Sequence, residues 1–183
     1  MRRITGSAMI AAGLALTPAL ATAQHGMSTP KHELGVDVAA YWASYSLAGV
    51  SSSNVNLMTP VDVRIAFVSK GTTEFEPRLA FSYASGAFGG TSQTIFRPDL
   101  NVLFTMGKAK AHNDNKYVTA GIGLAAGGGV TQLALNGGVG MRSPYESGAI
   151  RLEGFLAYLT KDSSKGVPST FAVGVRAGLS LWH

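Results

Sequence analysis

The segment Thr170–Trp182, with the sequence TFAVGVRAGLSLW, alternates between two kinds of residue. Apolar residues occupy the odd positions from Phe171 to Leu181, while alanine, glycine, serine and Arg176 occupy the even positions up to Ser180. Because successive side chains of a β-strand point to opposite faces, one face of this strand is apolar from end to end. Such a strand suits a wall between lipid and a polar interior, as in a transmembrane β-barrel.

Seven segments upstream show the same alternation and are separated by turn-forming residues, so the sequence predicts eight strands. These segments are His32–Tyr45, Val61–Phe67, Glu74–Tyr83, Gln93–Met106, Val118–Leu124, Leu133–Arg142 and Ile150–Tyr158. A long polar loop is predicted at Ser46–Thr59, and the sequence GKAKAHNDN, Gly107–Asn115, is predicted to be a turn. We therefore expect an all-β fold, an eight-stranded antiparallel up-and-down transmembrane β-barrel.

Acidic residues and arginines within these segments lie on the face opposite the large apolar side chains. Because an arginine at the midplane of a bilayer costs about 2–4 kcal/mol, this face must line the barrel interior. The planar guanidinium pairs well with carboxylates, so the interior charges are expected to neutralise one another. The residues predicted to form this structural ion network of the lumen are Asp37, Asp62, Arg64, Glu74, Glu76, Arg78, Arg97, Asp99, Arg142, Arg151, Glu153 and Arg176.

The interior of an eight-stranded barrel is just wide enough for side chains to fill, so we expect a sealed lumen. Arg78 is expected to pair with Glu74, Glu76 or a facing acid. Glycines of the later strands are expected to thin one wall and leave room for the charged side chains of the facing strands, namely Gly121, Gly123, Gly138, Gly140, Gly174 and Gly178. Lysines are expected in the tail, in turns or at a strand start, namely Lys31, Lys70, Lys108, Lys110, Lys116, Lys161 and Lys165.

Residues 1–23 have the pattern of a secretory signal peptide. Two arginines provide the positive start, Ile4–Leu20 is the apolar core, and Ala21–Ala23 supplies the small residues of a cleavage site. An uncleaved anchor helix is the alternative, which Pro18 within the apolar core disfavours. We expect a cleaved signal peptide over residues 1–23, a periplasmic tail over residues 24–31 and the barrel over residues 32–183.

Patterns typical of catalysis or cofactor binding are not found. The chain has no cysteine, and none of its four histidines lies inside a predicted strand beside a serine, as a barrel lipid hydrolase would need. Glu74 and Glu76 could suggest acid–base chemistry, but the nearby Arg78 favours an ion-paired role. Asp114 lies between two asparagines and is interpreted as a turn residue rather than a cation ligand. We expect no enzyme activity, no cofactor, no metal site and no nucleic-acid partner.

The leader, the eight alternating strands and the ion-paired interior together are typical of one group of bacterial proteins. The segments ALNGGVGMR at Ala134–Arg142 and SGAIRLEGF at Ser147–Phe155 are also typical of that group. Over residues 34–183 the chain resembles the small bacterial outer-membrane β-barrel proteins of the OmpA and OmpX type. The resemblance implies residence in outer-membrane lipid and recognition of the last strand by the barrel assembly machinery. That strand usually ends in an outward aromatic residue in the family, whereas here the outward series ends at Leu181.

The predicted function is that of a structural, envelope or surface-interaction protein of the bacterial outer membrane, with surface ligands contacted through extracellular loops. Two alternatives remain at this stage, a small-solute channel and a soluble secreted lipocalin-like binding protein. With a periplasmic tail and an even number of strands, four connections are expected outside the cell. These are Ser46–Thr59, Gly86–Thr91, Gly127–Val130 and Lys161–Pro168.

Overall fold

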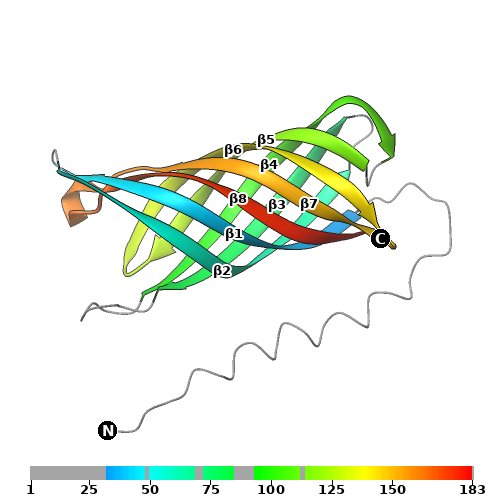
Figure 1. The fold of residues 1–183 in the computed structure, drawn as a ribbon. Helices are drawn as coiled ribbons and strands as arrows, with labels where there is room; N and C mark the ends of the chain where they lie inside the picture. Colours follow the sequence, from blue (N-terminus) through cyan, green and yellow to red (C-terminus); the bar gives the residue numbers. More distant parts are fainter. Residues whose placement is uncertain (1–31, 48–49, 69–71, 85–92, 112–113, 183) are drawn as a thin grey trace, which may run out of the picture.

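The computed structural model describes residues 32–47, 50–68, 72–84, 93–111 and 114–182. Eight strands form a closed antiparallel barrel, drawn from blue to red along the chain in Figure 1. The strands are β1 (His32–Leu47), β2 (Val50–Val68), β3 (Thr73–Ala84), β4 (Gln93–Ala111), β5 (Asp114–Gly127), β6 (Val130–Tyr145), β7 (Gly148–Leu159) and β8 (Ser169–Trp182). The expected leader and tail, and the expected loop Gly86–Thr91, lie outside the described residues.

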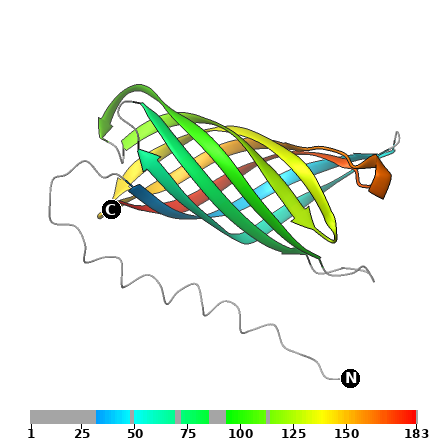
Figure 2. The ribbon, with the colours of Figure 1, turned by 180° about the vertical axis from the view of Figure 1, so that it is seen from behind.

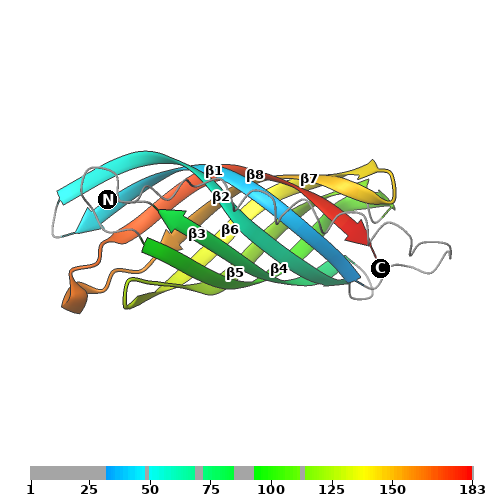
Figure 3. The same ribbon diagram turned by 90° about the horizontal axis from the view of Figure 1, so that it is seen from below.

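Each strand pairs with the next in sequence, and β8 returns to pair with β1, as the two opposite views in Figures 1 and 2 show. The closing ladder runs without a break from Glu33 opposite Trp182 to Ser46 opposite Ser169. The predicted eight-stranded up-and-down barrel is therefore confirmed. Figure 3 shows its two ends: β1 begins and β8 ends at the terminal end, and the η2 connection lies at the other, the loop end.

The predicted long loop Ser46–Thr59 is wrong. β1 and β2 stay paired up to Leu47 opposite Val50, so most of this segment belongs to β2. Its serines and asparagines have low strand propensity, but pairing with the backbone of β1 from Ala39 to Leu47 outweighs that preference. The ladder is irregular at one place: Asp62 lies opposite Asp37, whereas Ala39 lies opposite Met58.

The predicted end of the fourth strand is also wrong, because β4 continues past Met106 to Ala111. Gly107 has a positive φ of 70°, and the pairing with β5 shifts between Met106 and Ala111. A glycine adopts this backbone conformation without the steric penalty of a side chain, so the strand bends and continues. Lys108 and Lys110, which were expected in a turn, consequently lie in β4.

The distribution of side chains is inverted relative to a water-soluble protein. Large apolar side chains cover the outside, and 26 of the described ones are at least 38% exposed. Arg64, Arg142 and Arg151 are among the largest fully buried side chains, each at most 1% exposed. Because burying charge is costly unless it is paired, this inversion indicates an apolar environment outside the barrel and a dense ion network inside.

Inward glycines face large inward side chains on the neighbouring strand. Gly140 lies opposite Tyr117, and Gly35 lies opposite Arg64. A Cβ at Gly140 would overlap the Tyr117 ring, and a Cβ at Gly35 would overlap the Arg64 guanidinium. The glycines thus make room for the adjacent strand rather than for the facing wall, which corrects the expectation from the sequence.

The connection between β7 and β8 contains the short 3-10 helix η2 (Ser163–Lys165). Asp162 caps it and accepts hydrogen bonds from the backbone N–H and the hydroxyl of Ser164, at 3.1 and 2.6 Å. These bonds, led by the Ser164 hydroxyl, hold the pKa of Asp162 below its ordinary value. Lys165 Nζ donates to the Gly129 carbonyl at 2.9 Å, which ties this connection to the β5–β6 turn. Among the described residues, no helix is long and apolar enough to span a membrane.

Candidate functional site

The barrel interior is the candidate site, and its terminal half is filled by ion pairs that cross the lumen. Arg142 on β6 donates two hydrogen bonds to Glu74 on β3, at 2.9 and 2.6 Å. The same guanidinium donates to Glu33 Oε2 on β1 at 2.7 Å. One arginine therefore links three strands, two of which are not its neighbours in the sheet.

Arg64 on β2 is fully buried beside the seam where β1 meets β8. Its Nε donates to Asp37 Oδ2 at 2.8 Å, and its Nη2 donates to Ser180 Oγ at 2.8 Å. Its Nη1 donates to Glu33. Glu33 is therefore shared between Arg64 and Arg142, and the two clusters form one network.

Tyr117 on β5 is completely buried and joins the same network. Its hydroxyl accepts a hydrogen bond from Arg151 Nε and donates to Glu153 Oε2 at 2.8 Å. Arg151 also donates to Glu153 at 2.7 Å and to Glu76 on β3. The Arg151 guanidinium lies 4.7 Å from the Tyr117 ring centroid, a favourable cation–π distance.

Arg78 and Arg176 continue the network towards the middle of the barrel. Arg78 Nη2 donates to Glu76 Oε1 at 2.7 Å, and its Nη1 lies 3.6 Å from Asp62. Arg176 lies 3.4 Å from Glu153 and 3.8 Å from Asp62, with its guanidinium 4.3 Å from the Phe155 ring centroid. Within the described part of the chain, Asp62 is thus held by two long ion pairs.

Eleven of the twelve residues predicted for the ion network are buried, and the structure joins ten of them into one network across the lumen, whereas Asp99 pairs with Arg97 on its own strand. Arg97 is the exception, with a side chain that is 20% exposed and paired with Asp99 at 3.0 Å. The expectation that Arg78 pairs with Glu76 or a facing acid agrees with the observed contacts, but Glu74 pairs with Arg142 on a distant strand. Sequence spacing carried no signal for this long-range partner.

Four residues that contact the arginines of this network were not predicted as members of it: Glu33, Ser180, Tyr117 and Asn115, which is 6% exposed and accepts from Arg142 at 3.4 Å. Glu33 and Ser180 are 0% and 1% exposed and bind Arg64, while Tyr117 is 0% exposed and binds Arg151 and Glu153. Strand parity could have found Glu33, because it lies four residues before Asp37 and so on the same face. The same argument places Ser180 on the face of Arg176.

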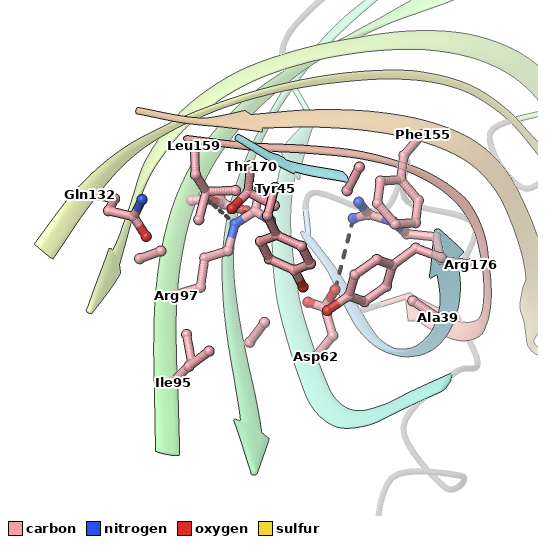
Figure 4. A pocket seen from close by; sticks show the side chains of 15 residues that line it. Ala39, Tyr45, Asp62, Ile95, Arg97, Gln132, Phe155, Leu159, Thr170 and Arg176 are labelled. Atoms are coloured by element: carbon pink, nitrogen blue, oxygen red, sulfur yellow. Dashed lines mark hydrogen bonds and ion pairs between the residues drawn. The ribbon is translucent and has the colours of Figure 1, made fainter. Parts of the chain in front are cut away.

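The loop half of the lumen contains a cavity of about 210 Å³, shown in Figure 4. Its floor includes Asp62 and Arg176, and Arg97 projects from β4. Tyr45 and Gln132 lie nearer the loop end of their strands. The interior is therefore divided into a filled terminal half and a hollow loop half. The described residues include no group of three or more potential ligands that could hold a metal ion.

A closed eight-stranded antiparallel barrel with an apolar exterior and an ion-paired interior defines the fold class of small transmembrane β-barrels. The fold is similar to that of Neisserial surface protein A (NspA), with 12% identity, coverage of 84% of this chain and 97% of that chain, and a TM-score of 0.62. It is also similar to Ail, the attachment invasion locus protein of Yersinia pestis, with 12% identity, coverage of 82% and 99%, and a TM-score of 0.50.

A second structure of Ail, in complex with the heparin analogue sucrose octasulfate, matches with 9% identity, the same coverage and a TM-score of 0.50. NspA and Ail are small bacterial outer-membrane barrels of eight strands. No protein-family model and no curated protein sequence matches the chain. The architecture expected from the resemblance to small outer-membrane barrels is confirmed at the level of the fold.

Proposed function

We propose that the protein is an integral barrel of the bacterial outer membrane whose ion-paired lumen is closed to solutes and whose loop end serves structural and surface-interaction roles. The observation that carries this proposal is the inverted distribution of side chains. A band of exposed leucine, valine, isoleucine and phenylalanine suits lipid, whereas arginines and carboxylates occupy the inside. A lipocalin-like protein in water would gain nothing from this exterior.

The ion network in the terminal half supports the proposal that the lumen is closed. Arg142, Arg64 and Arg151 reach carboxylates on other strands, and their side chains are 0% exposed. A buried arginine that loses its carboxylate is costly, so a path for solutes would require several such pairs to break at once. The proposal therefore assigns the predicted network a structural role and assigns no reaction to the barrel.

In this proposal, the N-terminal segment directs export of the protein and the C-terminal strand directs its assembly in the outer membrane. Residues 1–23 act as a cleaved signal peptide and residues 24–31 as a periplasmic tail in this proposal. β8 pairs with β1 over its whole length, so it closes the barrel and is the segment that the barrel assembly machinery would recognise. The loop end then faces the outside of the cell.

The surface role is supported by the arrangement of the connections. An up-and-down barrel collects the β1–β2, β3–β4, β5–β6 and β7–β8 connections at one end. Ail, which has a similar fold, has been crystallised with a heparin analogue. We include binding of a sulfated polysaccharide by whole cells among the tests of the surface role.

Reconstitution into lipid vesicles tests the first two parts of the proposal. The refolded protein should stay with the vesicles after an alkaline wash, should migrate faster on gels when unheated, and should give no stepwise conductance in planar bilayers. Steady single-channel currents would favour the small-solute channel instead. Recovery of a folded protein in the aqueous phase without detergent would contradict membrane residence.

A further inference from the structure

The cavity in the loop half of the lumen has a chemical character of its own. Alanines occupy inward positions on four strands around it, namely Ala39, Ala80, Ala125 and Ala172. These short side chains leave the space that longer residues fill in the terminal half. Tyr41, Tyr45 and Phe155 add aromatic surface, so the walls are largely apolar.

Three charged groups that line this cavity have a polar atom without a hydrogen-bond partner among the described residues, but one of them, Arg176 Nε, still lies 3.4 Å from Glu153 in an ion pair. Asp62 is 6% exposed, and its Oδ1 has no hydrogen-bond partner in the described part of the chain. Arg97 donates to Asp99 through Nε, but its buried Nη2 has no acceptor among the residues that the structure describes. Buried polar atoms in folded proteins are normally paired, so an unpaired acceptor and an unpaired donor in one cavity call for a partner that supplies both.

The sheet places these two groups on either side of one small residue. Asp62 lies opposite Ala80 on β3, and Ala80 lies opposite Arg97 on β4. Strands two positions apart are separated by about 10 Å, and both side chains project into the same space. The carboxylate and the guanidinium can therefore contact two ends of one small molecule that lies above Ala80.

Charge balance narrows the ligand class. Among the described interior side chains, seven carboxylates face six guanidinium groups; the carboxylates belong to Glu33, Asp37, Asp62, Glu74, Glu76, Asp99 and Glu153. A simple anion would add to this negative excess. A simple cation would leave Arg97 Nη2 unpaired and would lie near Arg176, whose Nη1 is 3.8 Å from Asp62. A ligand with one positive and one negative group adds no net charge and pairs with both Asp62 and Arg97.

We propose that the cavity binds a zwitterionic α-amino acid with an apolar side chain. The ammonium group donates to Asp62 Oδ1, the carboxylate accepts from Arg97 Nη2, and the side chain packs against the aromatic wall. Access is from the loop end, where a second cavity of about 300 Å³ shares Ile95 and Gln132 with the first. The filled terminal half lies beyond, so the ligand binds without passing through.

Isothermal titration calorimetry on the refolded barrel tests this proposal with three probes. Phenylalanine carries both charges, phenethylamine lacks the carboxylate, and phenylacetate lacks the ammonium group. We expect phenylalanine to bind at least about tenfold more tightly than either analogue, since each analogue leaves one buried polar group unpaired. Equal binding of either analogue, or no binding of phenylalanine, would overturn the proposal.

Variants distinguish the cavity from partition into detergent. Ala80→Phe fills the cavity without changing any charge and should abolish phenylalanine binding. Ala177→Phe adds the same volume on the exposed outer face of β8 and should leave binding unchanged. Asp62→Asn and Arg97→Gln should each weaken the binding of phenylalanine. Asp62→Asn should reduce the advantage of phenylalanine over phenylacetate, which lacks the ammonium group, and Arg97→Gln should reduce its advantage over phenethylamine, which lacks the carboxylate. Binding that survives Ala80→Phe would contradict the proposed site.

Measurements on the same samples distinguish failure of the amino-acid site from failure of the proposed function. Faster mobility of the unheated protein and absence of conductance test the sealed membrane barrel. A barrel that passes both tests and binds no probe would refute the amino-acid site alone. A barrel that conducts ions would refute the sealed lumen, whatever the outcome of the titrations.

Discussion

Arg142 and Glu74 form a two-point ion pair across the barrel, with hydrogen bonds of 2.9 and 2.6 Å between β6 and β3. These strands are not neighbours in the sheet, so the pair joins opposite walls of the lumen. Both side chains are almost completely buried. A contact of this kind holds the cross-section of the barrel in a way that the strand ladders alone do not.

Arg142→Leu should lower the free energy of unfolding by about 3–5 kcal/mol, because it leaves Glu74 and Glu33 without this guanidinium in a buried setting. Urea unfolding in detergent micelles measures the change. Lys161→Leu, at an exposed position after β7, should change the stability by less than about 0.5 kcal/mol. The double variant Arg142→Leu/Glu74→Leu should recover part of the loss. Additive losses in the double variant would mean that the pair is not coupled.

Gly140→Ala should destabilise the barrel by about 1–3 kcal/mol, because the new methyl group overlaps Cζ and Oη of Tyr117. Gly137→Ala is the matched control on the same strand. Its Cβ would meet nothing closer than the Thr119 carbonyl oxygen at 3.4 Å, which is ordinary contact. The temperature at which gel mobility changes on heating compares the two variants. An equal shift for both would show that Tyr117 does not limit the space at Gly140.

Ser163→Cys and Ser147→Cys test the orientation of the barrel in the membrane. Both serines are exposed, and they lie in the connections at opposite ends of β7, the first in η2 and the second in the β6–β7 turn. A membrane-impermeant maleimide applied to intact cells should label the cysteine at 163 and leave the one at 147 unlabelled. Both should react after the outer membrane is permeabilised. Labelling of only the cysteine at 147 in intact cells would reverse the orientation.

Deletion of residues 179–183 should abolish insertion into the membrane. The deletion removes the ladder positions of β8 that pair with β1 from Glu33 to Val36, and it also removes Ser180, which accepts from Arg64. An open barrel would expose unpaired backbone groups to lipid, at a cost of several kcal/mol for each group. The yield of heat-modifiable protein in the outer-membrane fraction measures the effect. A normal yield would show that closure at this end of β8 is dispensable.

The sequence alone predicted the number of strands, the closed antiparallel class and the inward face of twelve charged residues, although it did not include Glu33 among them. Arg64, Arg142 and Glu153 are buried, as expected from their positions, which alternate along the strand with outward apolar residues. The reason is physical: strand side chains alternate with a period of two, and a charge that faces lipid carries a large penalty. Local alternation therefore fixes the inside and the outside of such a barrel.

Strand ends and ion partners were decided by the tertiary structure. β2 begins at Val50 rather than Val61 because the backbone of β1 pairs with it as far as Leu47, whatever the propensity of its serines. Glu74 forms a two-point ion pair with Arg142, and not only the expected contacts along its own strand, because closure of the sheet brings β3 and β6 face to face across the lumen. Parity fixes the face of a side chain, but the distance across the lumen, which selects its partner, exists only once the eight strands have closed.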